Sequence, residues 1–127
     1  MKLVLDASIL IDKLRGGHRW DAFLDNVDKT AELFVPSIVA FELYAGNSTK
    51  EAKNAKIVAN ILSFFQLVDL TLEIGIQAGE IYRDITKTLQ IPDYLIAVTA
   101  ISLGGYIVTL NQKHFKQIPG VRIYHYA

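Results

Sequence analysis

Three acidic residues stand apart from the other acids of the chain because apolar sequence surrounds each of them. Asp6 follows a run of three apolar residues, and Glu42 lies within the sequence Val-Ala-Phe-Glu-Leu-Tyr. Asp93 precedes residues 94–112, which contain no charged side chain. Carboxylates that converge repel one another unless a cation lies among them, and oxygen ligands suit Mg²⁺ or Mn²⁺, which activate water for phosphodiester hydrolysis. We therefore predict that Asp6, Glu42 and Asp93 are catalytic residues and ligands of a divalent metal ion.

The sequence also leaves a structural role open for each of these acids. Asp6 is equally suited to capping the helix that follows it, because an Asp at that position accepts backbone N–H bonds. Glu42 lies on a helix with apolar neighbours and needs a partner, which is either a metal ion or a Lys or Arg side chain. Asp93 opens a helix, where the helix dipole and the free N–H groups favour an acid.

Strands and helices alternate along the chain, and this order determines where the acids lie. The alternation indicates a mostly parallel sheet with helices on both faces, so we predict an α/β fold, a three-layer α/β/α sandwich. Sites in such sheets form at the carboxyl ends of strands, which is where Asp6 falls. The expected strands are residues 2–5, 31–35, 67–70, 106–110 and 121–126, the last at an edge; the expected helices are 9–14 with Ser8 as its cap, 20–27, 38–44, 49–65, 72–89, 93–103 and a short one between the last two strands.

The composition is typical of a folded domain. The chain has 127 residues, of which 51% are hydrophobic, and we expect residues 1–127 to form a single domain. The absence of cysteine excludes disulfides, thiolate metal sites and a thiol nucleophile. Nothing at the N-terminus has the pattern of a secretory signal, so we expect a cytoplasmic protein. The uncharged residues 94–112 contain the pair Gly104-Gly105, which favours a buried helix followed by a strand over a membrane span.

The charges are balanced overall but unevenly distributed. The formal net charge is zero, with 13 basic and 13 acidic residues, so the total charge gives no sign of nucleic-acid binding. Beyond Asp93 there is no acid, whereas Lys113, Lys116 and Arg122 follow, and the C-terminal third is therefore locally basic.

Several other side chains have ordinary structural interpretations. Asp12 is expected to be solvated on the first helix, and Phe64 and Phe65 are expected in the core. Three lysines spaced three residues apart share a helix flank that is expected to face solvent. They are Lys50, Lys53 and Lys56.

Four short segments of the chain form a specific pattern. They are Leu5-Asp6-Ala7-Ser8, Glu42-Leu43-Tyr44-Ala45-Gly46, residues 93–100, and Val108-Thr109-Leu110-Asn111 with His114-Phe115. In their residue types, spacing and order they resemble the PIN-domain family, and within it the VapC-type toxins of toxin–antitoxin pairs. The resemblance spans nearly the whole chain. It implies an α/β/α sandwich, bound Mg²⁺ or Mn²⁺, endonucleolytic cleavage of RNA, a homodimer and a cognate antitoxin.

The same resemblance assigns supporting roles to Ser8, Thr109 and Asn111. Ser8 matches the family's hydroxyl residue that holds the first Asp of the site, although it is also a good helix cap. Many members carry a fourth acid at the position of Asn111 or His114, and this chain has none. Asn111 is able to ligate a cation through its amide oxygen without adding charge, so we expect one firmly held ion. Lys113 and His114 are candidate substrate contacts, although a lone His is also an ordinary surface residue.

Two other functions compete with a ribonuclease toxin. The first is a catalytically weak PIN domain that acts as an RNA- or protein-binding module, which the missing fourth acid favours. The second is a phosphatase or receiver domain with Asp6 as phosphoacceptor. A phosphatase of that type needs a second Asp where Ser8 stands, and a receiver needs a Lys where Thr109 ends the late strand. Neither pattern fits.

Overall fold

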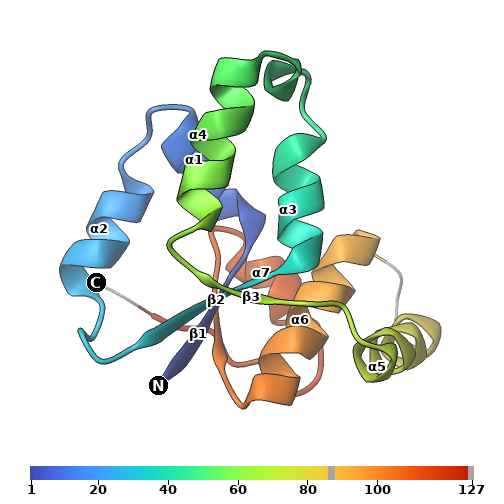
Figure 1. Ribbon diagram of the computed structural model, residues 1–127. Helices are drawn as coiled ribbons and strands as arrows, with labels where there is room; N and C mark the ends of the chain where they lie inside the picture. Colours follow the sequence, from blue (N-terminus) through green and yellow to red (C-terminus); the bar gives the residue numbers. More distant parts are fainter. Residues whose placement is uncertain (86–87, 126–127) are drawn as a thin grey trace.

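The protein is built on a four-stranded parallel β-sheet (Figure 1). The computed structural model describes residues 1–85 and 88–125. The order across the sheet places the first strand of the chain in the interior, next to the last one, and each neighbouring pair is parallel. The strands are β1 (Lys2–Leu5), β2 (Glu32–Pro36), β3 (Gln66–Val68) and β4 (Tyr106–Val108), in the order β3-β2-β1-β4.

The helices cover both faces of this sheet. They are α1 (Ala7–Leu14), α2 (Arg19–Asn26), α3 (Ser37–Tyr44), the 3₁₀ helix η1 (Asn47–Lys50), α4 (Ala52–Leu62), α5 (Leu72–Asp84), α6 (Ile91–Leu103) and α7 (Gln112–Phe115). In Figure 1, α1, α3 and α4 lie above the sheet and α6 lies below it, with α5 packed against α6. This arrangement confirms the predicted α/β/α fold.

β1 lies in the centre of the molecule, and its position determines where Asp6 lies. Leu3, Val4 and Leu5 are completely buried, because helices cover both faces of this interior strand. Parallel pairing brings the carboxyl ends of β1 and β4 to the same edge, where the backbone N–H of Asp6 donates to the Val108 carbonyl oxygen at 3.0 Å. The residues that follow these two strands are therefore neighbours in space.

α6 brings Asp93 to the same edge of the sheet. The helix begins after Gln90 and ends at Gly104, whose φ of 67° favours glycine. The next residue, Gly105, allows β4 to approach β1, because a Cβ there would lie 2.8 Å from the Lys2 carbonyl oxygen. Residues 94–112 thus contain the expected helix and strand, and in the part of the chain described here no helix has the length and apolar content needed to cross a membrane.

The strand expected at residues 121–126 is wrong in extent. Ile123 makes one isolated parallel bridge with Ile107 of β4. The N–H of Ile107 donates to the Arg122 carbonyl at 2.8 Å, and the N–H of Tyr124 donates to the Ile107 carbonyl at 2.9 Å. The segment lies along the edge of β4 as expected, but β4 is only three residues long and offers no longer ladder. Residue 126 lies outside the described residues.

The helix expected at residues 49–65 is interrupted near its start. η1 and α4 replace it, with Glu51 between them in extended conformation. The Thr49 hydroxyl donates to the Tyr44 carbonyl at 2.8 Å, and the Asn54 amide donates to the Ser48 carbonyl at 2.9 Å. These side chains engage backbone carbonyls that would otherwise serve helical bonds, which is how Thr and Asn weaken helix starts.

Other boundaries shift by a few residues. α1 begins two residues earlier than expected, the strand expected at 67–70 is β3, and the helix expected to reach residue 89 ends at Asp84. Residues 86–87 of that expected helix lie outside the described residues. Phe65 is buried as expected and its ring lies 5.6 Å from that of Trp20. The core position expected for Phe64 is wrong, because the chain turns there and leaves its side chain 80% exposed.

Candidate active site

Asp6 lies directly between β1 and α1, and its carboxylate faces β4. The side chain is 4% exposed, and the Thr109 hydroxyl donates to Asp6 Oδ2 at 2.8 Å. Asp6 occupies the N-cap position of α1, but its side chain makes no capping hydrogen bond. The carboxylate is therefore oriented by a side chain that is 103 residues away in the sequence, and not by the helix start.

Ser8 and Thr109 form a hydroxyl network that fixes Asp6. The N–H of Leu110 donates to Ser8 Oγ at 3.0 Å, the N–H of Asn111 donates to Thr109 Oγ1 at 2.9 Å, and the two hydroxyl oxygens lie 3.3 Å apart. Thr109 has one hydroxyl proton, which Asp6 receives, so Ser8 is the donor within the hydroxyl pair. Ser8 thus acts on Asp6 through Thr109. Its predicted role as a helix cap is wrong, because no side chain caps α1.

Glu42 lies on α3 with its carboxylate partly buried. Its Oε1 atom is buried and has no hydrogen-bond partner. The pKa of Glu42 is raised to about 7, first by burial and then by the negative charges of Asp6 and Asp93. No ion pair among the described residues includes Glu42, so the salt bridge that the sequence left open is not formed there.

Asp93 has a structural role and also interacts with the other acids. Its Oδ2 accepts a hydrogen bond from the Gln90 N–H at 3.2 Å, which completes a reciprocal capping box at the start of α6. Burial and the charge of Asp6 raise the pKa of Asp93, whereas the Gln90 N–H and the charge of His114 lower it. The helix-start role left open by the sequence is present, and the side chain also interacts with Asp6.

These three residues, called the acid cluster below, come from three distant parts of the chain and repel one another electrostatically. As the side chains stand, no three His, Cys, Asp or Glu residues in the described ranges enclose a metal ion. The chemistry of the cluster nevertheless fits a hard divalent cation, because the donors are carboxylate oxygens and Glu42 Oε1 is buried without a partner. A cation would remove the repulsion and satisfy that oxygen.

A pocket of about 720 Å³ opens next to the acid cluster. Thr109, which donates to Asp6, forms part of its wall, and so does His114, whose charge acts on Asp93. Asn111 and Lys113 also face this pocket, and neither lies among the groups that perturb the acid cluster. We call this cavity the basic pocket; its lining residues are Arg19, Ala22, Thr109, Leu110, Asn111, Gln112, Lys113, His114 and Lys116.

Comparison with known proteins identifies the family. The PIN domain family matches residues 3–121. The chain belongs to the PIN-domain family. Ribonuclease VapC19 of Mycobacterium tuberculosis is 32% identical to this PIN domain over 129 residues, which cover 96% of this chain and 98% of that protein. The tRNA(fMet)-specific endonuclease VapC of Salmonella typhimurium is 31% identical, covering 97% of this chain and 96% of that protein.

Solved structures agree with this PIN-domain assignment. A chain of VapBC2 from Rickettsia felis, crystallised with a DNA fragment from its promoter, superposes with a TM-score of 0.84 at 25% identity, covering 98% of each chain. A chain of DNA-bound VapBC from Salmonella typhimurium gives a TM-score of 0.82 at 27% identity, covering 98% of this chain and 97% of that chain. PIN-domain ribonucleases generally depend on a divalent metal.

Asp12 and Arg19 were not expected from the sequence to lie beside the site of this PIN domain. Asp12, which was expected to be solvated, is partly exposed, and its Oδ2 accepts a hydrogen bond from the Arg19 N–H at 3.1 Å at the start of α2. Gly17 makes this contact possible, because a Cβ there would overlap the Asp12 carboxylate. Arg19 is thereby held beside the basic pocket. The signal was an acid placed shortly before a glycine and a helix start.

Proposed function

We propose that this protein is a VapC-type endoribonuclease that hydrolyses RNA phosphodiester bonds with Mg²⁺ or Mn²⁺. The observation that carries the proposal is Glu42, whose buried oxygen has no partner although Asp6 and Asp93 lie within electrostatic reach. Such a group of carboxylates is stable when a cation binds to it. Similarity over nearly the full length to proteins named ribonuclease and endonuclease supports the same activity. Asp6, Glu42 and Asp93 would be both the metal ligands and the catalytic residues.

Each residue of the site has a task that follows from its contacts. Thr109, supported by Ser8, holds the Asp6 carboxylate in one orientation. Glu42, with a pKa of about 7, readily exchanges its proton near neutral pH and is ionised when a cation approaches. A bound divalent cation supplies an activated water and neutralises charge on the phosphate. His114 and Lys113, which line the adjoining pocket, are the proposed contacts to the RNA.

A cleavage assay tests this function. Purified protein and single-stranded RNA are incubated with Mg²⁺ or Mn²⁺, and the 5′- and 3′-labelled products are resolved. We expect internal cuts that disappear with EDTA and in Asp6→Asn, because the carboxylates would no longer hold the ion. Undiminished cleavage by Asp6→Asn, or cleavage that resists EDTA, would contradict the proposal.

A binding module without catalysis is the second candidate. The observation in its favour is the absence of an acid at Asn111 and His114, together with side chains that do not enclose an ion as they stand. Binding of Mn²⁺ discriminates the two functions. An enzyme takes up the ion and loses it when Asp6 is changed, whereas a module of this kind binds RNA equally well with and without it.

The proposed partners are a cognate antitoxin and a second copy of the chain, and the proposed compartment is the cytoplasm. The VapBC names of the similar structures support the first partner. Large apolar side chains are exposed on several elements, as expected for protein interfaces. They include Phe64 at 80%, Leu72 at 77%, Ile91 at 66% and Phe41 at 63%.

Analytical ultracentrifugation tests the homodimer directly. We propose that residues 1–127 act as one domain and that two such domains associate, since symmetric pairs are the commonest oligomers. The expected result is a sedimentation coefficient of a dimer at micromolar concentration. A clean monomer over that range would contradict the homodimer and leave the nuclease proposal unaffected.

A further inference from the structure

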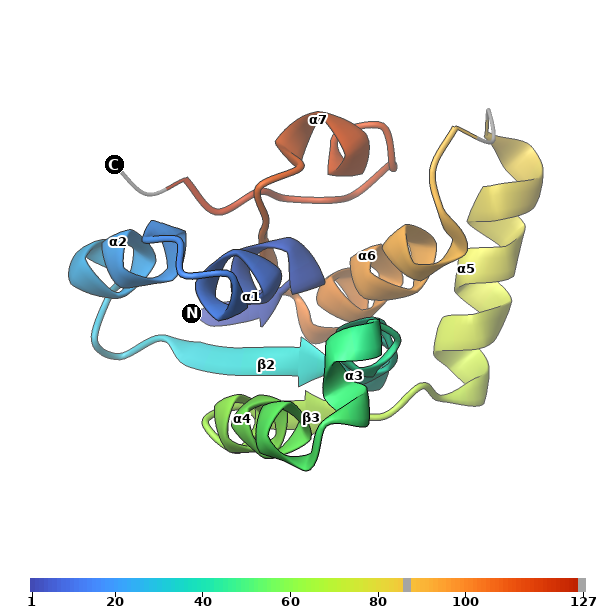
Figure 2. The same cartoon turned by 90° about the horizontal axis from the view of Figure 1, so that it is seen from above.

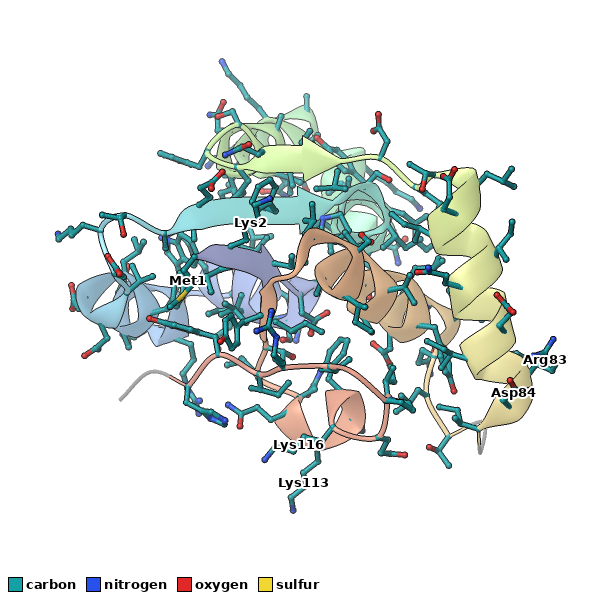
Figure 3. All side chains as sticks on the ribbon, turned by 90° about the horizontal axis from the view of Figure 1, so that it is seen from below. Met1, Lys2, Arg83, Asp84, Lys113 and Lys116 are labelled. Atoms are coloured by element: carbon teal, nitrogen blue, oxygen red, sulfur yellow. The ribbon has the colours of Figure 1, made fainter. Side chains whose placement is uncertain are left out.

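The basic pocket combines cations from two separate parts of the chain. Arg19 begins α2, whereas Lys113, His114 and Lys116 belong to α7 or follow it. In Figure 2, α7 and the α1–α2 pair lie on one side of β2, and α4 lies on the other. In Figure 3, the side chains of Lys113 on α7 and of Lys116 directly after it point away from the rest of the molecule. The fold therefore brings Arg19, from the N-terminal part of the chain, to the basic residues of the C-terminal third.

The arginine and the two lysines of this pocket, unlike His114, are not paired with the protein's own acids in the described part of the chain. Among the described residues, no ion pair includes Arg19, Lys113 or Lys116. Within residues 1–85 and 88–125, no acidic residue lines the basic pocket. Asp12 accepts a hydrogen bond from the Arg19 backbone N–H and makes no ion pair with the Arg19 side chain. A cavity with several unpaired cations and no lining acid favours an anionic ligand.

We propose that the basic pocket binds the phosphate of an RNA nucleotide next to the one that is cut, with Arg19 and Lys116 as its main contacts. The inference rests on the proposed ribonuclease function and deepens it. The acid cluster takes the scissile phosphate only with a cation, because carboxylates alone repel it. The neighbouring phosphate would instead be neutralised by the cations of the basic pocket. This pocket adjoins the acid cluster, because Thr109 and His114 line the pocket and also act on Asp6 and Asp93.

The lining of the basic pocket points to the RNA backbone and not to a base. Among the residues that the structure describes, no Phe, Tyr or Trp ring lines the cavity, so these residues offer none of the aromatic platforms on which bases stack. Arg and Lys on flexible stems suit phosphate contacts, which position the strand without reading its sequence. Binding through this pocket is therefore expected to be independent of base identity.

Binding of RNA without divalent ions tests the proposal apart from catalysis. A fluorescent single-stranded RNA of about ten nucleotides and mixed sequence is titrated with protein in EDTA at several salt concentrations. One phosphate contact contributes a slope of about 0.7 in log K against log salt, or about fivefold in affinity near 0.1 M salt. We expect Arg19→Ala and Lys116→Ala each to weaken binding by about this factor and to flatten the slope.

Matched controls come from α4 and from charge-preserving variants. Lys53 and Lys56 are exposed lysines on α4, away from α7 in Figure 2, and their Ala variants should bind as the wild type does. Arg19→Lys should retain most of the affinity, because a point charge is sufficient for a phosphate. A second RNA with a different sequence should show the same losses.

A parallel cleavage assay with Mg²⁺ distinguishes the possible failures. If the wild type cuts RNA but Arg19→Ala and Lys116→Ala bind like the wild type, the nuclease function stands and the pocket assignment is overturned. If binding depends on Arg19 and Lys116 but no cutting occurs, the pocket is a phosphate site for RNA, whereas the nuclease function and the place of that phosphate beside a cut bond are overturned. If the wild type neither binds nor cuts RNA, both are overturned.

Discussion

The acid cluster and the basic pocket are neighbours built in opposite ways. The acid cluster uses partly or fully buried carboxylates, of which Asp6 is held by a hydroxyl and Asp93 by a capping hydrogen bond. The basic pocket uses long, exposed cations that make no ion pair among the described residues. The difference teaches where rigidity is needed: bond cleavage requires fixed oxygens, whereas holding a flexible strand requires only accessible charge.

The largest expected effect is the loss of RNA cleavage, without loss of RNA binding, when one residue of the acid cluster is changed. Asp93→Asn should reduce RNA cleavage by at least about a thousandfold, since ion activation of water contributes several kcal/mol. The amide oxygen is still able to accept the Gln90 N–H bond, so the start of α6 should survive. Steady-state cleavage and circular dichroism measure the two properties.

RNA binding in EDTA provides the contrast for Asp93→Asn. The affinity should equal or exceed that of the wild type, because one negative charge beside the strand is gone. A variant that loses RNA binding and cleavage together would break the separation between the acid cluster and the basic pocket.

The next effect tests the rigidity of the acid cluster. Thr109→Val keeps the shape of the buried side chain but removes the hydroxyl that donates to Asp6. We expect metal affinity and cleavage to fall by about tenfold, as is usual for residues that orient a ligand. Ser8→Ala should have a smaller effect in the same direction, because Ser8 reaches Asp6 only through Thr109. Equal or larger loss in Ser8→Ala would contradict the assigned order of contacts.

A third effect concerns stability against pH in the metal-free protein. The folded-state pKa of Glu42, about 7, lies above its ordinary value of 4.5, so the folded state holds this proton more tightly than the unfolded state. The resulting stabilisation is complete below about pH 4.5 and is lost as the pH rises through about 7. Because Glu42 is only half-buried, solvent screening reduces the effect to about 1–2 kcal/mol.

Glu42→Gln should abolish that pH dependence. In EDTA at pH 8 the variant should melt at a higher temperature than the wild type, and at pH 4 the two should be alike. Added Mn²⁺ should stabilise only the wild type at pH 8. Differential scanning calorimetry at both pH values measures the melting temperatures. A metal-free wild type that melts above Glu42→Gln at pH 8 would contradict the expected direction of the effect.

The smallest expected effect lies at the boundary between the two regions. Asn111 lines the basic pocket, and its N–H donates to Thr109, which holds Asp6. Asn111→Asp adds a charged ligand and should tighten Mn²⁺ binding a few-fold, while weakening RNA binding in EDTA because it repels phosphate. Calorimetry and the RNA titration give the two values. If the affinities for Mn²⁺ and for RNA both rose or both fell in Asn111→Asp, the position of Asn111 at the boundary of the two regions would be contradicted.

The sequence allowed the fold and the acids to be anticipated for a simple reason. Asp6, Glu42 and Asp93 interrupt apolar sequence, and an isolated charge among buried residues needs an explanation. The alternation of strands and helices then places Asp6 at the carboxyl edge of the sheet. Both signals are local in the sequence and remain visible without coordinates.

Contacts between distant residues could not be anticipated in this way. The Asp12 hydrogen bond to the Arg19 N–H is local, but the meeting of Arg19 with residues of α7 at one pocket depends on tertiary packing, which no local pattern records. Ser8 was expected either to cap a helix or, from the family resemblance, to hold Asp6; its hydroxyl pairs with Thr109, 101 residues away, a contact that local sequence alone does not indicate. Phe64 has the apolarity of a core residue, and only the turn before β3 exposes it.

Titration calorimetry with Mn²⁺ is the most direct test of the central claim that the acid cluster holds one divalent cation. Three carboxylates carry less charge than a four-acid site, so a second ion close to the first would be poorly compensated. The account predicts a single tight site in the wild type that disappears in Asp6→Asn and persists in Lys116→Ala. Two tight sites in the wild type, or unchanged binding in Asp6→Asn, would contradict it.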